Sequence, residues 1–344
     1  MTNTTGAFRY QSEPVPALAC AMLICLVAAD PGTAADHAAL ALEHTILLGD
    51  VRGRIDHLAV DLRRQHLFVA ELGNGSIAAV DLKSGSVWRR VTGLREPQGV
   101  LFVPATDELH VASGGDGTVR VYRGDDLAAA GIIPLRDDAD NLRLDPQGHQ
   151  IIAGHSDGAL ALLDATTHRL VADIALGAHP EGFQISRDGQ RAYVNIPARR
   201  EIAVVDLSRR QRVASWPMTG AAANFPMAIE PRDSSVWVAS REPPRLVRFT
   251  PDGATALTLD TCGDSDDLFF DELRHRLYVI CGSGQVDVLE QRGSQYTRIA
   301  RIATVPGART GLFVPELDTL FVAARATGQH PAAILVFRPD KPPP

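Results

Sequence analysis

The chain has 344 residues, of which 45% are hydrophobic and 22% are charged, and its formal net charge is −7 at pH 7. A chain of this length and composition can bury a large core. A mildly acidic protein without a basic block gains nothing from neutralising phosphates, so we expect no nucleic-acid partner.

The first 35 residues differ in composition from the rest of the chain. An apolar run of thirteen residues, ALACAMLICLVAA, begins at Ala17 and is shorter than a membrane-spanning helix but long enough for the core of a signal peptide. Small residues before Asp36 offer a cleavage site. We therefore expect residues 1–35 to be a signal peptide and the mature protein to be periplasmic or secreted, without a membrane span. An uncleaved anchor or a misplaced start codon is the alternative, because only Arg9 is basic here.

From residue 58 onward, an apolar residue that opens a short alternating segment recurs every 41 to 44 residues. These register positions are Leu58, Val100, Leu142, Phe183, Met227, Leu268 and Leu312. In the clearest unit, 181–216, alternating segments fall near 183–185, 193–194, 202–205 and 212–216, separated by polar turns. Period-two alternation bounded by turns predicts antiparallel strands, and a four-stranded unit of just over forty residues is typical of a β-propeller blade.

The sequence therefore predicts an all-β fold, a seven-bladed β-propeller of four-stranded antiparallel blades. The last unit ends after three strands, while the segment from His44 to Leu48 precedes the first unit. We expect this N-terminal strand to complete the last blade and close the ring, which leaves no strand edge open. A single propeller domain would cover residues 36–338, followed by a disordered tail over residues 339–344.

The motif HPEGFQISRDGQRAYVN, followed by IAVVDL, has counterparts in EPQGV at Glu96 and FPMAI at Phe225. These motifs resemble the YVTN family of bacterial β-propeller repeats, in the superfamily of seven-bladed lactonase and cytochrome d1-like propellers. The resemblance covers residues 44–338. It implies the architecture rather than the function, because such propellers serve as binding proteins, scaffolds and enzymes.

Two of the four cysteines, Cys262 and Cys281, follow the predicted signal peptide. A single pair in an exported chain is consistent with a disulfide. In a propeller, these positions lie at the end of one blade's fourth strand and at the end of the next blade's second strand, on the same face. We therefore expect a Cys262–Cys281 disulfide, with two free buried thiols as the alternative.

The loops before the first strands and the loops between second and third strands converge at one mouth of the central channel, where propellers generally bind ligands. Their polar residues form the predicted ligand-binding set: Asp56, His57, Gln98, Asp140, Asn141, His155, His179, Glu181, Asn224, Asp266, Asp267 and Arg309. Hydrogen-bonding caps on the strand ends require similar residues, so a structural role is the alternative for each.

Three chemistries fit subsets of these residues. The first is calcium binding by the oxygen-bearing side chains Asp56, Asp140, Asn141, Glu181, Asn224, Asp266 and Asp267; apart from calcium, we expect no cofactor. The second is lactone hydrolysis or cycloisomerisation, with His179, Glu181 and Arg309 as acid, base and anion anchor. The third is copper, zinc or haem binding by His57, His155, His179 and His330.

The sequence contains no Cys-x-x-Cys-His motif, no phosphate-binding glycine loop before a helix and no Gly-x-Ser-x-Gly elbow. It therefore favours an exported, monomeric binding or scaffold protein over an enzyme. Such a protein would present its polar loop face to a small molecule, a peptide or a protein. The alternative function is a lactonase-type hydrolase or cycloisomerase at the same channel mouth, with or without calcium.

Overall fold

The computed structural model describes residues 1–2, 38–156 and 158–341. The chain divides into two units, Met1–His37 and Ala38–Pro344, and the described strands belong to the second. The predicted signal peptide falls almost entirely on residues outside the described part, so it stays a prediction. Within the described part, no helix has the length and apolar character needed to cross a membrane.

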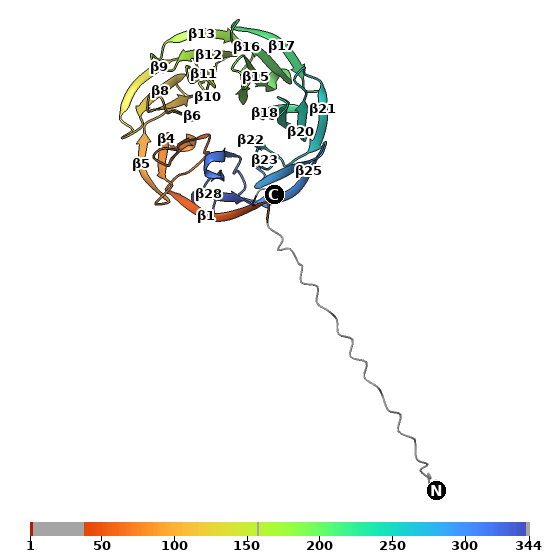
Figure 1. Ribbon diagram of the computed structural model, residues 1–344. Coiled ribbons are helices and arrows are strands. Elements are labelled where there is room, and N and C mark those ends of the chain that lie inside the picture. Colours follow the sequence, from red (N-terminus) through yellow and green to blue (C-terminus); the bar gives the residue numbers. More distant parts are fainter. Residues whose placement is uncertain (3–37, 157, 342–344) are drawn as a thin grey trace. The chain divides into compact units, whose positions relative to one another are not determined.

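The second unit is a seven-bladed β-propeller, which confirms the fold predicted from the sequence (Figure 1). Its described residues form 28 strands in seven four-stranded antiparallel sheets. In the last blade, β1 (Leu40–Gly49) pairs with β28 (Ala332–Pro339), with Ile46 opposite Ile334. The N-terminal strand therefore closes the ring, as predicted.

Each of the first six blades takes its four strands in chain order. Blade 1 consists of β2 (Leu58–Asp61), β3 (His66–Glu71), β4 (Ser76–Asp81) and β5 (Ser86–Thr92). Blade 2 consists of β6 (Pro97–Val103), β7 (Glu108–Ser113), β8 (Thr118–Arg123) and β9 (Ala129–Pro134). Blade 3 consists of β10 (Leu142–Leu144), β11 (Gln150–His155), β12 (Ala159–Asp164) and β13 (Leu170–Ala175).

The remaining blades repeat this arrangement. Blade 4 consists of β14 (Phe183–Ile185), β15 (Arg191–Ile196), β16 (Glu201–Asp206) and β17 (Gln211–Pro217). Blade 5 consists of β18 (Ala222–Ile229), β19 (Val236–Glu242), β20 (Pro244–Phe249) and β21 (Thr255–Asp260). Blade 6 consists of β22 (Ser265–Asp271), β23 (Arg276–Cys281), β24 (Gln285–Arg292) and β25 (Gln295–Ala303). Blade 7 consists of β26 (Thr310–Val314), β27 (Thr319–Ala324), β28 and β1, and short 3-10 turns cover Leu72–Asn74, Pro197–Arg199 and Pro315–Leu317.

The core lies between neighbouring blades rather than at the centre of the ring. One apolar cluster, for example, joins Phe68 and Ala70 of blade 1 to Leu109 and Val111 of blade 2. The second and third strands are buried on both faces, whereas outer strands such as β5 are mostly exposed. Successive side chains along a strand point to opposite faces of the blade, so they pack against the two neighbouring blades in turn. This packing stabilises the ring.

The prediction of a disordered tail from residue 339 is wrong for its first residues. Pro339 ends β28 and pairs with Leu40, and the carbonyl oxygen of Asp340 accepts a hydrogen bond of 2.6 Å from Arg274. The Asp340 carboxylate also pairs with the nearly buried Arg276. Two buried guanidinium groups need acceptors, and this segment supplies them. Residues 342–344 lie outside the described part.

Candidate functional site: the channel mouth

Four of the predicted acids occupy the same position in different blades, two residues before the register position. They are Asp56, Asp140, Glu181 and Asp266, in blades 1, 3, 4 and 6. For the first three, the backbone N–H donates to a carbonyl of the same blade's second strand, at Ala70 (2.8 Å), Gly154 (2.9 Å) and Asn195 (3.0 Å) respectively. Because the same backbone bond recurs around the ring, it directs these side chains toward one mouth of the channel.

These acids surround a small cavity of about 30 Å³. A water molecule needs roughly 10–15 Å³, so the cavity has room for a pair of waters or for one ammonium group. Five carboxylates line it against two guanidinium groups and one imidazole. The charged lining residues are Arg54, Asp56, His57, Asp140, Arg143, Glu181, Asp266 and Asp267.

Three of the carboxyl groups have raised pKa values, which means that their ionised form is disfavoured. Burial, with the charges of Asp56 and Glu181 adding to it, raises the pKa of Asp140 to about 7. Burial and the neighbouring charge of Asp266 raise the pKa of Glu181 to about 7. Burial likewise raises the pKa of Asp266 to about 6. A raised pKa means that the surroundings disfavour negative charge, so a cation that entered the cavity would be stabilised.

His57 lies between two of the acids, 3.8 Å from Asp56 and 3.7 Å from Asp267. Burial alone would lower the pKa of His57, but Asp267 and Asp56 outweigh it and raise the pKa to about 10. The ring is therefore protonated at neutral pH. Asp267 is also fixed by the backbone N–H of Gly311, at 2.8 Å.

Asp56 is the least exposed of these acids. Its side chain is only 1% exposed, and neither carboxylate oxygen has a hydrogen-bond partner among the described residues. Arg54 reaches to within 2.9 Å of it without the geometry of a hydrogen bond. The Asp56 carboxylate is therefore stabilised by the charges of Arg54 and His57 rather than by hydrogen bonds.

Two arginines hold Asp266 from the outer side of the mouth. Arg309 Nε lies 3.1 Å from Asp266, and Arg241 pairs with the same carboxylate while its guanidinium lies 3.7 Å from the centre of the Phe225 ring. Both arginines also contact Asp264, at 3.1 Å and 3.3 Å. Arg309 is therefore already neutralised, which leaves it poorly placed to anchor a substrate anion.

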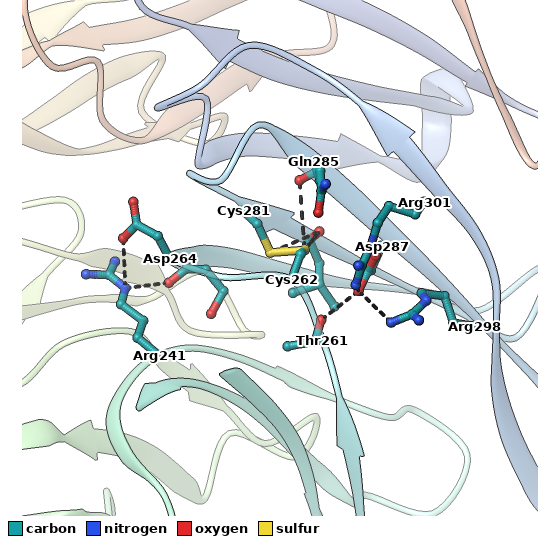
Figure 2. Close-up of a disulfide and its surroundings, with 11 residues drawn as sticks. Arg241, Thr261, Cys262, Asp264, Cys281, Gln285, Asp287, Arg298 and Arg301 are labelled. Atoms are coloured by element: carbon teal, nitrogen blue, oxygen red, sulfur yellow. Dashed lines mark hydrogen bonds and ion pairs between the residues drawn. A yellow bond between two sulfur atoms is a disulfide. The ribbon is translucent and has the colours of Figure 1, made fainter. Parts of the chain in front are cut away.

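Cys262 and Cys281 are joined by a disulfide, with Cα atoms 5.8 Å apart (Figure 2). The bond joins Cys262, in the segment between β21 of blade 5 and β22 of blade 6, to Cys281 at the end of β23, and Figure 2 shows Arg241 and Asp264 on one side of it. The bond ties the segment that leads to Asp264, Asp266 and Asp267 to the end of β23. It therefore anchors the acidic loop of blade 6 at the mouth.

Four other predicted residues are engaged elsewhere. Gln98 donates to Asp138 (3.2 Å), His155 pairs with Asp173 (2.9 Å), His179 bonds the Ser156 carbonyl (2.8 Å), and Asn224 donates to Asn195 (2.8 Å). Asn141 does line the cavity and donates to Asp140 over 3.3 Å. Of the four predicted histidine ligands, His57 is the only one that lines this cavity, and of the three proposed lactonase residues, only Glu181 does so.

Sequence reasoning missed Arg54, Arg143 and Gln184, which also line the cavity. Arg143 and Gln184 directly follow the register residues Leu142 and Phe183. Alternation turns the register residue into the core and the next residue toward the channel. A polar residue directly after a register residue could therefore have indicated that Arg143 and Gln184 line the channel.

Two wider hollows adjoin the acidic cavity along the channel. One, of about 270 Å³, shares His57, Arg143 and Asp267 with it, and the other, of about 370 Å³, shares Gln184 and Leu268. Both are lined largely by half-buried apolar side chains, among them Val60, Leu101, Ile185, Ile229, Phe269, Phe270 and Leu312. The channel is thus acidic at one point and apolar beside it.

The calcium prediction depends on how closely the oxygen ligands gather. Calcium binds oxygen at about 2.3–2.6 Å, so ligands of one ion lie within about 5 Å of one another. Among the described residues, the one group of three or more His, Cys, Asp or Glu side chains whose ligand atoms lie within 4.8 Å of one another is Glu108, His110 and His168. None of these lines the acidic cavity, and calcium at the mouth stays a prediction.

Fold and site together define a seven-bladed β-propeller with an acidic channel mouth. No family model and no curated protein matches the chain, so membership of the YVTN family stays a prediction. Among solved structures, the chain is similar to a chain of Kuenenia stuttgartiensis hydrazine synthase, with a TM-score of 0.73 and 16% identity over 87% of this chain and 99% of that one. Identity this low shows a shared fold alone.

Proposed function

We propose that this protein is a binding propeller whose channel takes an organic cation. An ammonium group of the ligand would lie among the acids of the mouth, and an apolar portion would lie along the adjoining channel wall. The observation that carries this proposal is the convergence of Asp140, Glu181 and Asp266, all with raised pKa values, on a cavity of about 30 Å³.

The charge balance favours a cation over an anion. Even with His57 protonated, five carboxylates face three positive groups in the lining; the two arginines that pair with Asp266 but lie outside the lining, Arg241 and Arg309, also pair with Asp264. A bound ammonium group would offset the repulsion among Asp56, Asp140 and Glu181 and would donate hydrogen bonds to oxygens that lack partners.

The apolar hollows favour a ligand with a hydrocarbon portion. Burying an apolar surface contributes about 25 cal/mol per Å², so each methylene that reaches this wall would add up to about 0.8 kcal/mol. A free small amine, or a lysine side chain of a peptide or protein, has this combination of head and stem. The proposal includes export, on the strength of the apolar run at 17–29, and a monomeric state.

The test is isothermal titration calorimetry of the purified chain at pH 8 with n-alkylammonium ions from butyl to octyl. We expect affinity to rise with chain length, while alkyl carboxylates of the same lengths do not bind. The double variant Asp140→Asn/Glu181→Gln should bind at least 10-fold more weakly. Asp260→Asn removes a carboxylate that is 79% exposed on β21 and is the matched control.

Absence of alkylammonium binding to the wild type would contradict the proposal, as would an equal loss in the control variant. Calcium is titrated in parallel. Calcium binding without amine binding would replace this proposal with the calcium site predicted from the sequence.

The alternative function, a lactonase-type hydrolase or cycloisomerase, has support from one observation. Asp140 and Glu181, both with pKa values near 7, could accept or donate a proton at neutral pH. Hydrolysis of simple γ- and δ-lactones, measured with and without calcium and lost in Glu181→Gln, would establish this activity. No turnover in either condition would remove it.

A further inference from the structure

A cluster of two histidines and one glutamate lies between blades 2 and 3, and none of its residues lines the channel cavities. Glu108 and His110 belong to β7, and His168 lies in the turn between β12 and β13. We propose that Glu108, His110 and His168 bind one zinc ion that joins the two blades, with a fourth position left to water.

The three ligand atoms are already close to the positions that zinc requires. Glu108 Oε2 lies 2.9 Å from His168 Nε2 and 3.5 Å from His110 Nε2, and all three ligand atoms lie within 4.8 Å of one another. Ligand atoms on one tetrahedral zinc ion stand about 3.4 Å apart, because the bonds to nitrogen and oxygen are about 2.0–2.2 Å long. Small side-chain rotations would therefore complete the site.

An ordinary ion pair between Glu108 and His168 does not explain why a histidine is buried beside it at position 110. His110 is 0% exposed, and both of its ring nitrogens lack a hydrogen-bond partner among the described residues. Leaving buried polar groups unpaired has a cost in stability. A bound zinc ion would give Nε2 a partner and offset part of this cost.

Comparison with the other blades shows how unusual this histidine is. The equivalent residue, which is the third of the second strand except in β19, where it is the second, is a large, buried side chain in every other blade: Phe68, Ile152, Tyr193, Trp237, Tyr278 and Phe321. Where such a side chain has a polar tip in blades 5 and 6, a carboxylate satisfies it: Trp237 donates to Glu230 (3.2 Å) and Tyr278 to Asp271 (2.7 Å). His110 occupies the same core position, but no carboxylate forms a hydrogen bond with its ring nitrogens.

The third ligand is held in place by its own turn. The side chain of Asp164 accepts hydrogen bonds from the backbone N–H groups of Thr166 (3.1 Å) and Thr167 (2.7 Å), and the N–H of His168 donates to the Asp164 carbonyl (2.9 Å). The side chains of His168 and Glu108 are 24% and 17% exposed, which leaves an entry path from solvent. The site is therefore partly assembled and accessible.

The donor set favours zinc over calcium or magnesium. Two imidazoles and one carboxylate are a known zinc combination, whereas calcium and magnesium prefer oxygen ligands throughout. Metal binding requires neutral imidazole rings, which is the ordinary state of histidine above about pH 6.5.

The test uses untagged full-length protein that has been stripped with EDTA and dialysed. Calorimetric titration with zinc chloride should show one equivalent bound with submicromolar affinity, and zinc should raise the melting temperature. Cobalt(II) in place of zinc should give the visible absorption of a four-coordinate site.

His110→Phe is the decisive variant, because phenylalanine stands at this position in blades 1 and 7 and should leave the fold intact. We expect it to bind zinc at least 100-fold more weakly and to show no zinc-dependent shift in melting temperature, and we expect His168→Gln to behave alike. His149→Gln, an exposed histidine, and Asp140→Asn, at the channel mouth, should bind zinc as the wild type does. Failure of the wild type to bind zinc, or undiminished binding by His110→Phe, would overturn the proposal.

Discussion

The blade interfaces and the channel mouth are built from the same strands but are satisfied to different degrees. At the interfaces, with the exception of His110, apolar side chains meet apolar partners, and the polar tip of Tyr278 donates to Asp271. At the mouth, Asp56 lacks hydrogen-bond partners and the pKa values of Asp140 and Glu181 are raised. The difference teaches that the interfaces stabilise the fold, whereas the mouth gives up stability in the way that functional sites do.

The largest effect should come from the interface. Phe68→Ala removes a fully buried ring that packs against Phe102 with ring centres 5.8 Å apart. We expect a loss of about 3–5 kcal/mol in the free energy of unfolding, measured by urea denaturation. Under native conditions alkylammonium affinity should be unchanged; a weaker affinity would show that the two regions are coupled.

The disulfide connects the two regions, and its removal should cost somewhat less. In the double variant Cys262→Ser/Cys281→Ser, a bond between residues 19 apart is lost. Loop-closure entropy predicts a loss of roughly 3 kcal/mol. Because the bond anchors the loop of Asp266 and Asp267, alkylammonium binding should also weaken in calorimetry. Full affinity would show that the loop holds its position without the bond.

At the mouth, a substitution should raise the free energy of unfolding instead of lowering it, because it removes a charge that is disfavoured there. Asp140→Asn eliminates a buried carboxyl group whose ionisation is disfavoured, and each pKa unit corresponds to about 1.4 kcal/mol. The shift from 3.8 to about 7 sets an upper limit of about 4 kcal/mol, and the new amide is itself a buried polar group, so we expect a net gain of about 1–2 kcal/mol at pH 8 by urea denaturation and a smaller gain at pH 5. Destabilisation at pH 8 would indicate that the ionised carboxylate holds the mouth together.

The pH dependence of the wild type should be smaller and should have the same cause. Asp140 and Glu181, with ordinary pKa values of 3.8 and 4.5, titrate near 7 in the fold, so they bind protons more tightly when folded and lower the stability as pH rises from about 4 to 7. The contribution of His57 is complete below its ordinary pKa of 6.5 and is lost as pH rises to about 10.

The melting temperature should therefore fall between pH 5 and pH 9. In the Asp140→Asn/Glu181→Gln variant, the part of this fall below about pH 7 should shrink to the contribution of Asp266, whose pKa is raised to about 6, while the part due to His57 persists. A melting temperature that rises over this range would contradict the raised pKa values assigned to Asp140, Glu181 and His57.

The period of the sequence was sufficient to predict the blades, the ring closure and the loops that meet at the mouth. The acids were predictable for the same reason: Asp56, Asp140, Glu181 and Asp266 share one position in the repeat. The direction in which each side chain points could not be predicted from the repeat. His155 and His179 lie in the right loops, but each bonds a nearby partner, Asp173 or the Ser156 carbonyl, because local acceptors are within reach.

Contacts between blades were also beyond the repeat pattern. The pairing of Glu108 with His168 joins residues 60 apart in different blades, and the period gives no information on which turns approach which strands. The contact of Asp340 with Arg276 likewise depends on where the chain passes after the last strand. Such pairs require the three-dimensional arrangement.

The most direct test of the central claim is the proton release that accompanies cation binding. Octylammonium should be titrated into the wild type at pH 6.5 by calorimetry in two buffers with different ionisation enthalpies. Because Asp140 and Glu181 are partly protonated at this pH, an ammonium group that binds among them should displace a measurable fraction of a proton, and in Asp140→Asn/Glu181→Gln the release should fall to the small contribution of Asp266. Binding with no proton release, or release that is undiminished in the variant, would contradict the assignment of the cation site to these acids.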